Sequence, residues 1–300
     1  MKKPQLTFAI PFYGTVAYLK ATLASLQKQA VSEWLAIVVD DASPDKSARA
    51  LVESLDDDRI SYIRNPTNLG LADNWNRCID LCRTPLVTLL HADDELLPEY
   101  AAIMLAAHAR WPSASAIFCG AQTIGPGGEL LVSIRDLVKK WLRPKSDEPF
   151  TLAGATGVTT LLRGNLIVCP TLCYKRALFD ELRFASDWRM VLDLEFYLRA
   201  LIAGAQIVGI PDVAYRYRRH PDQTTEIFEK NLQRYTEEIQ LWRWAASAAD
   251  RYNWEETAVV ARKMTILKLQ LVHSILGDMT RLSMRSAGRK ITLLRAMVGA

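Results

Sequence analysis

Apolar runs alternate with helical patterns over the first third of the chain. Short apolar runs predict buried strands, and apolar residues that recur every three or four positions predict helices. The expected strands are 6–10, 34–39, 59–63 and 86–90, and the expected helices are 15–29, 48–55, 73–81 and 100–110. Repeated strand–helix–strand units predict an α/β fold with a mostly parallel sheet flanked by helices.

The pattern changes beyond residue 110. Short strands around the turn at 125–128 predict a hairpin, and a basic amphipathic piece follows at 136–145. The later expected elements are helices at 156–162 and 192–203, a strand at 206–210 that ends at Pro211, and helices from about residue 225. No internal repeat interrupts this order.

Polar residues follow several of the expected strands. Pro11-Phe12-Tyr13, Asp40-Asp41 and Asp93-Asp94 each come directly after one. In parallel sheets ligands bind beyond the carboxyl ends of the strands, so these residues predict a ligand site. Adjacent carboxylates after a core strand suit Mg²⁺ or Mn²⁺ carrying a phosphorylated ligand. The alternative is that Asp94, Glu95 and Glu99 form the acidic first turn of the 100–110 helix.

Composition excludes several classes of protein. Half of the 300 residues are hydrophobic and the net charge is +4, which is typical of a folded globular protein. No stripe of basic residues interleaved with aromatic ones indicates nucleic-acid binding. The 6–10 run is too short for a signal segment, and no long uncharged stretch follows, so we expect a cytoplasmic protein. The five cysteines, an odd number without ligand spacing, predict reduced core thiols rather than zinc ligands.

Six motifs carry a family resemblance. They are Ile10-Pro11-Phe12-Tyr13-Gly14, Val38-Val39-Asp40-Asp41-Ala42-Ser43, Asn65-Pro66-Thr67-Asn68-Leu69-Gly70-Leu71-Ala72, His91-Ala92-Asp93-Asp94, Asp193-Leu194-Glu195-Phe196-Tyr197-Leu198-Arg199 and Tyr215-Arg216-Tyr217-Arg218-Arg219-His220. In this order and spacing the chain resembles family 2 glycosyltransferases of the GT-A fold. The resemblance implies a GT-A domain over 1–225 and a helical region over 226–300. Within the domain it implies a nucleotide-binding half, 1–95, and an acceptor half, 96–225.

The resemblance also implies roles for individual residues in donor binding. Asp41 matches the acceptor of the uracil N–H, Pro11 and Tyr13 line the base, and Asn68 and Gly70 belong to the same donor site. Asp93 faces ribose and phosphate, and Asp94, together with Asp93, binds a divalent metal, Mn²⁺ or Mg²⁺. His91 stands where the family usually has an aspartate, and Gly14 where asparagine is common.

Catalytic and acceptor roles are implied in the same way. Asp193 matches the base that deprotonates the acceptor hydroxyl, although a first-turn aspartate of a helix would look the same. Glu195 and Arg199, four residues apart, predict a surface ion pair. The basic pair Arg218 and His220 would meet the diphosphate, the alternative being a solvated basic loop. The loop with Arg163 and Asn165 is where the family often contacts the acceptor.

The last forty residues are basic and amphipathic. They carry eight Lys and Arg residues against Asp278 alone, a net charge of +7, and Ile266, Leu269, Val272, Leu276 and Met279 recur at helical spacing. Basic amphipathic helices can lie on an anionic membrane surface, which for this protein would be the inner face of the membrane. The alternative is that they pack on the catalytic domain or on a second copy of the chain.

These features predict an inverting, metal-dependent hexosyltransferase. Its partners are a nucleotide-sugar, with UDP as the expected nucleotide, and a hydroxyl of a cell-surface glycan or lipid-linked acceptor. The alternative is a non-catalytic protein that binds sugar nucleotides or glycans on the same fold.

Overall fold

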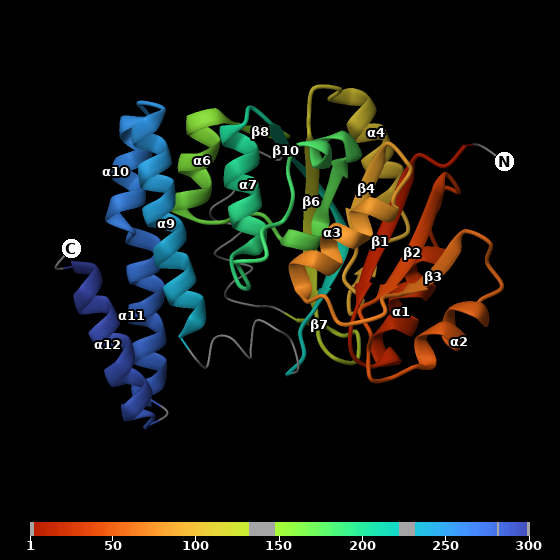
Figure 1. The fold of residues 1–300 in the computed structure, drawn as a ribbon, viewed down its shortest axis with the longest axis horizontal. Helices are drawn as coiled ribbons and strands as arrows, with labels where there is room; N and C mark the ends of the chain where they lie inside the picture. The colour runs from red at the N-terminus through yellow and green to blue at the C-terminus, as the bar shows by residue number, and fades with distance from the viewer. Residues whose placement is uncertain (1–2, 132–147, 222–231, 281, 299–300) are drawn as a thin grey trace. The chain divides into compact units, whose positions relative to one another are not determined.

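The computed structural model describes residues 3–131, 148–221, 232–280 and 282–298 (Figure 1). The chain divides into two compact units, one formed by Met1–Gly154 and Leu166–His220 and the other by Ala155–Asn165 and Pro221–Ala300. The basic piece expected at 136–145 lies outside the described residues. Among those described, no helix is long and apolar enough to cross a membrane.

A mixed sheet organises the first unit. Its order is β3-β2-β1-β4-β9-β6-β10-β5, and β7 and β8 pair with β6 and β10. The strands are β1 (Leu6–Phe12), β2 (Trp34–Asp40), β3 (Ile60–Arg64), β4 (Leu86–Leu89), β5 (Glu95–Leu96), β6 (Ala116–Ile124), β7 (Leu130–Leu131), β8 (Phe150–Ala153), β9 (Leu172–Lys175) and β10 (Gln206–Arg218). Strands β3, β2, β1 and β4 run parallel, as expected, whereas β9 is antiparallel to both of its neighbours.

Both faces of the parallel strands are covered by helices. The helices of this unit are α1 (Val16–Gln27), α2 (Ser47–Glu53), α3 (Leu71–Leu81), α4 (Tyr100–Arg110) and α7 (Leu192–Ile202), with short 3₁₀ turns at Cys169–Thr171 and Arg176–Asp180. Phe8 and Ile10 of β1 share a buried cluster with Leu23 of α1 and Met104 of α4. Alternate strand residues face opposite sides, and α3 covers the other side of β1 and β2.

Two details of the first unit differ from expectation. Strand β10 runs on through Pro211, because the pairing with β6 shifts register between Gly209 and Val213 and a proline is tolerated at such a bulge. Asp94 and Glu95 do not belong to a helical first turn, because Glu95 lies in β5 and α4 starts only at Tyr100. The acidic-turn alternative for these two residues is therefore wrong.

The second unit is helical in its described part. It consists of α9 (Gln233–Arg251), α10 (Glu255–Lys263), α11 (Thr265–Thr280) and α12 (Met284–Val298), together with nearly all of α6 (Gly154–Arg163). Thr159 of α6 and Thr257 of α10 hydrogen-bond through their hydroxyls at 2.7 Å. The first unit therefore does not cover the whole expected domain of 1–225, since residues 155–165 fold with the carboxy-terminal helices.

Candidate functional site

Three strand ends meet at one edge of the sheet. Phe12 of β1 pairs with Asp40 of β2, and the Asp41 N–H donates to the Phe12 carbonyl at 2.8 Å. On the other side of β1, the Leu90 N–H donates to the Ala9 carbonyl at 3.0 Å, just before the His91–Asp94 segment. The polar residues that follow these three strands are therefore neighbours, as the parallel order predicted.

Asp40 and Asp41 have different tasks. Asp40 is fully buried and accepts hydrogen bonds from the Ser43 N–H at 2.7 Å and from Tyr62 and Arg64 at 2.5 Å each. Burial, followed by the bond to Asp40, raises the pKa of Tyr62. These bonds tie the end of β3 to the end of β2, so Asp40 shapes the edge rather than facing a ligand.

Asp41 organises the loop before α3. One carboxylate oxygen accepts from Asn65 Nδ2 and the Leu69 N–H, both at 2.8 Å, and the other accepts from the Gly70 N–H at 2.9 Å. The Asn68 side chain donates to the Asp41 carbonyl at 3.1 Å. The structure thus brings together the predicted residues Asp41, Asn68 and Gly70, and Asp41 is only 2% exposed.

Two asparagines complete this loop and were not predicted as site residues. Asn65 Nδ2 also donates to Asn74 Oδ1 at 2.9 Å, and Asn74 Nδ2 donates to the Val39 carbonyl at 3.3 Å. Asn74 is buried on the face of α3 that also carries Trp75 and Cys78. A polar residue among the apolar positions of an amphipathic helix is the signal that could have identified it.

Beside this loop, the end of β1 offers an exposed ring. Pro11 is half-buried, and the Tyr13 side chain is 61% exposed. Gly14 follows with φ of +130°, and its N–H donates to Ser43 Oγ at 3.1 Å. The turn after β1 is therefore held against the turn after β2, and Tyr13 is left facing solvent.

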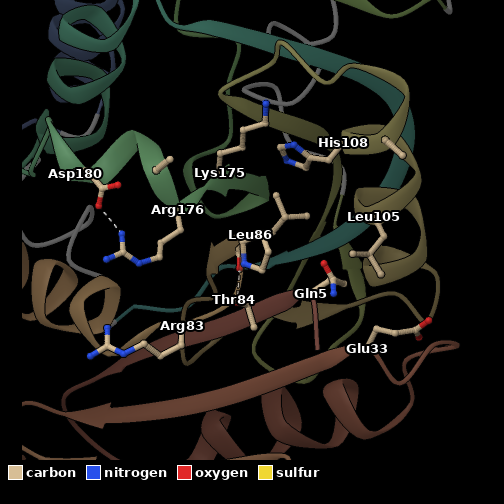
Figure 2. Close-up of a pocket in the computed structure, with 13 residues that line it drawn as sticks. Gln5, Glu33, Arg83, Thr84, Leu86, Leu105, His108, Lys175, Arg176 and Asp180 are labelled. Carbon is tan, nitrogen blue, oxygen red and sulfur yellow. Dashed lines mark hydrogen bonds and ion pairs between the residues drawn. The ribbon is translucent and has the colours of Figure 1, made fainter. Parts of the chain in front are cut away.

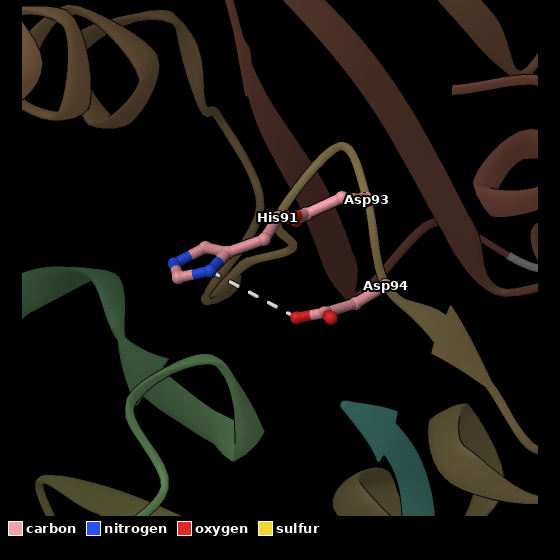
Figure 3. A group of neighbouring side chains, drawn as sticks. All are labelled: His91, Asp93 and Asp94. Carbon is pink, nitrogen blue, oxygen red and sulfur yellow. Dashed lines mark ion pairs between the residues drawn. The ribbon is translucent and has the colours of Figure 1, made fainter. Parts of the chain in front are cut away.

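His91, Asp93 and Asp94 form a cluster that could hold a metal ion (Figure 3). One ligand atom from each lies within 4.8 Å of the others, and His91 Nδ1 is 3.8 Å from Asp94 Oδ2. The His91 ring packs on Trp75 of α3 with centroids 5.6 Å apart. Burial lowers the pKa of His91, so its ring is neutral and can act as a ligand near pH 7.

The two carboxylates of this cluster point into different surroundings. Asp94 is fully buried, and it accepts from the Tyr215 hydroxyl at 2.9 Å and the Arg218 N–H at 2.7 Å. Burial and the charge of Asp93 raise its pKa well above the usual range. The Asp93 side chain keeps 30% exposure and accepts from His220 Nε2 at 3.0 Å. Although burial alone would raise the pKa of Asp93, His220 and His91 lower it overall.

His220 and Arg218 both reach this segment from the end of β10. The His220 ring packs on Tyr18 of α1, with centroids 4.7 Å apart, while it bonds to Asp93. Arg218 is 2% exposed and donates to the Asp93 carbonyl at 2.7 Å, to the carbonyls of Gly125 and Pro126, and to Glu95. The diphosphate contact expected of Arg218 stays a prediction, and it would require some of these buried bonds to break.

The fourth predicted carboxylate comes from α7. Asp193 lies in the first turn of this helix, half-buried, and its charge adds a smaller part to the pKa values of Tyr174 and Tyr197, which burial raises most. The expected pair of Glu195 and Arg199 is present, at 2.5 Å, but Glu195 is buried rather than on the surface.

Arg163, expected near the acceptor, ends α6 in the second unit and pairs with Glu256 at 2.6 Å.

A pocket lies at the opposite edge of the sheet, where β4 begins (Figure 2). Its volume is about 830 Å³, and Thr84, Leu86, His108 and Lys175 are among the residues that line it. Arg176 in its wall pairs with Asp180 at 2.6 Å. It contains none of the predicted site residues. None of the five cysteines, all within the described residues, forms a disulfide, and burial raises the pKa of Cys82 to about 12.

Comparisons with known proteins identify the family that this chain resembles. The model of the family described as glycosyl transferase family 2 matches residues 7–163. The uncharacterized glycosyltransferase MJ1057 of Methanocaldococcus jannaschii is 21% identical over 221 residues, which cover 73% of this chain and 72% of that protein.

Solved structures share the fold. TarS 1–349 of S. aureus in complex with UDP-GlcNAc has a TM-score of 0.60 at 16% identity, covering 87% of this chain and 70% of that one. The mannosyltransferase PcManGT from Pyrobaculum calidifontis in complex with GDP-Man and Mn²⁺ has a TM-score of 0.62 at 16% identity, covering 99% and 85%. These likenesses confirm the GT-A fold expected from the motifs.

Proposed function

This chain belongs to glycosyl transferase family 2, and from that membership we propose an inverting hexosyltransferase that takes its sugar from a nucleotide-sugar. One observation carries the proposal. The His91, Asp93 and Asp94 cluster follows β4 at the sheet edge where the Asp41 loop follows β2, with only β1 between the two strands. A cluster that could hold a divalent metal, next to a loop that could bind a nucleotide, suits transfer from a sugar diphosphate, because the cation would neutralise charge on the departing diphosphate.

The donor nucleotide is assigned to the Asp41 side of this edge. Pro11 and the exposed ring of Tyr13 offer a surface for the base, and Asn68 and Gly70 hold the loop. The Asp41 oxygen that accepts from Gly70 keeps a second lone pair for an imide N–H, the donor group of uracil. UDP is therefore the proposed nucleotide, as in the TarS complex with UDP-GlcNAc.

The metal is assigned to the adjacent cluster. Asp93 is its best-placed ligand because its carboxylate is partly exposed, whereas both Asp94 oxygens already accept hydrogen bonds. The carboxylate oxygens of this cluster suit Mn²⁺, which is present in the PcManGT complex, or Mg²⁺, and the neutral ring of His91 offers an additional nitrogen that Mg²⁺ would not use. A bound divalent cation neutralises the charge that develops on the departing diphosphate. His220, bonded to Asp93, is proposed to face the same phosphates.

Asp193 is the proposed base. Its carboxylate would take the proton of the acceptor hydroxyl while that oxygen attacks the anomeric carbon, and attack opposite the leaving group inverts this centre. The proposed acceptor is a cell-surface glycan or a lipid-linked glycan at the inner face of the membrane, since the carboxy-terminal helices are basic and amphipathic.

Ligand-dependent unfolding tests the donor and metal roles. We expect a UDP-sugar, among UDP-, GDP- and dTDP-sugars, to raise the unfolding temperature, and Mn²⁺ to increase the shift, because a ligand that binds the native state stabilises it. Asp93→Asn should remove the Mn²⁺-dependent part. Asp180→Asn, at the opposite edge of the sheet, is the matched control and should behave like wild type.

Three outcomes would contradict the proposal in different ways. A wild-type chain that binds no nucleotide-sugar would exclude the function itself. An unchanged Mn²⁺ response in Asp93→Asn would exclude the metal assignment. Donor binding without transfer to any glycan or hydrolysis of the donor would favour the alternative, a non-catalytic protein that binds sugar nucleotides.

A further inference from the structure

Helix α11 presents apolar side chains on two of its faces. Leu267, Leu271 and Ile275 are buried within the second unit. Another row is exposed and is called the α11 stripe: Leu269 (60% exposed), Val272 (40%), Leu276 (56%) and Met279 (45%). Because these residues are three or four positions apart, they form a line along the helix. The amphipathic pattern seen in the sequence therefore contains more apolar surface than the packing of this unit uses.

The turn after α11 extends this surface. Leu282 is 85% exposed with φ of +58°, a conformation that leucine rarely adopts, and Met284 is 61% exposed. Helices α11 and α12 lie side by side as a hairpin, and these residues form its tip (Figure 1). Single exposed apolar residues are ordinary, but six on one hairpin indicate a surface that a membrane or another molecule covers.

The charge around the stripe indicates what covers it. Residues 261–300 carry a net charge of +7, and Asp278, the one acidic residue among them, pairs with Lys290 at 2.7 Å. Exposed arginines remain at Arg285 and Arg289 on α12. A second copy of this chain would bring the same positive charge to the contact, which opposes self-association. An anionic surface is complementary to it.

We propose that the α11–α12 hairpin binds an anionic membrane surface. The α11 stripe, Leu282 and Met284 insert among the acyl chains near the headgroups, and the arginines of α12 contact lipid phosphates. This inference adds a specific lipid-contacting surface to the proposed function, and it requires no turnover. It explains why apolar residues are left exposed on a hairpin that also carries exposed arginines.

Vesicle sedimentation of the full chain tests the surface. We expect binding to phosphatidylcholine vesicles that contain about one third phosphatidylglycerol, and at least about tenfold weaker binding to phosphatidylcholine alone, since anionic lipid attracts basic segments. Leu269→Ser combined with Leu276→Ser should weaken binding by at least about tenfold, because two inserted side chains are lost. Arg285→Glu combined with Arg289→Glu should weaken it similarly, and raised salt should reproduce that loss.

A matched variant controls for general effects. Val259→Ser changes another exposed apolar residue of the same unit, on α10, at 45% exposure, and should bind vesicles like wild type. Each variant is also checked for its unfolding temperature and UDP-sugar binding, which the membrane inference predicts to be unchanged. Failure of donor binding in wild type would therefore affect the proposed function alone.

The inference is overturned by any of three results. These are wild-type chain that stays in the supernatant with anionic vesicles, stripe variants that bind as tightly as Val259→Ser, and a wild-type dimer in light scattering that the stripe variants convert to monomer. The last result would assign the stripe to a second copy.

Discussion

Replacing Arg218 separates a structural role from a phosphate-binding role. Its side chain is 3% exposed, and its guanidinium bonds to Glu95 and to the carbonyls of Asp93, Gly125 and Pro126. Arg218→Ala would leave the buried carbonyls without this donor, and Glu95 with only the more distant Arg216. Removing one member of a buried ion pair typically costs about 3–5 kcal/mol. For a unit of this size, that loss corresponds to a fall in unfolding temperature of roughly 10 °C.

A matched control lies on the same strand. Arg216 also approaches Glu95, at 3.7 Å, but its side chain is 39% exposed. An exposed pair at that distance contributes about 0–1 kcal/mol, so Arg216→Ala should change the unfolding temperature little. Arg218→Lys keeps the charge but not the planar fork, and it should fall between the two alanine variants.

Thermal unfolding and calorimetric titration with a UDP-sugar measure the two roles separately. The structural assignment expects Arg218→Ala to unfold early and, below its unfolding temperature, to bind donor within a few-fold of wild type. A variant with wild-type unfolding temperature and at least tenfold weaker donor binding would refute it, and would place the guanidinium on the diphosphate as the family resemblance implies.

Other variants test the base, the loop and a buried histidine. Asp193→Asn should retain donor binding and lose about 10²–10⁴-fold in turnover, and wild-type turnover would exclude it as the base. Gly70 has φ of +83° and ψ of 171°, a conformation that essentially only glycine adopts, with open space around its α-carbon, so Gly70→Ala should cost about 1–3 kcal/mol through backbone strain alone, measured by denaturant unfolding. Burial lowers the pKa of His108 from 6.5 to about 4, so the unfolded chain takes up its proton first as pH falls. The neutral ring therefore stabilises the fold above pH 6.5, and about 3 kcal/mol should be lost between pH 6.5 and pH 4. His108→Gln should lack this dependence, and parallel pH profiles would contradict it.

Much of the parallel half of the fold could be predicted from local patterns. The strand expected at 34–39 is observed at Trp34–Asp40, and the helix expected at 100–110 is observed at Tyr100–Arg110. The spacing of apolar residues depends on which face of a helix or strand is buried, and that spacing can be seen within a single segment of the sequence. The strand end predicted at Pro211 was wrong, because a bulge in β10 accommodates the proline. That bulge depends on the pairing with β6 and cannot be seen in the local sequence.

The neighbourhood of the candidate site was likewise predictable, but the orientation of its side chains was not. Parallel order places the ends of β1, β2 and β4 together whatever the tertiary details, so Asp41 and Asp93 were expected on one edge. Asn74 escaped notice because its partners, Asn65 and Val39, belong to other elements of the chain.

The sequence by itself determined which residues follow the core strands, because hydrophobic period and turn chemistry are local properties. Only the tertiary structure decided that Asp93 keeps access to solvent while Asp94 turns inward to Tyr215 and Arg218. It also decided that Arg218 is buried beside Glu95. Adjacent residues of like chemistry are equivalent in sequence, and they become different because β10, more than a hundred positions away, places hydrogen-bond donors on the carboxylate of only one of them.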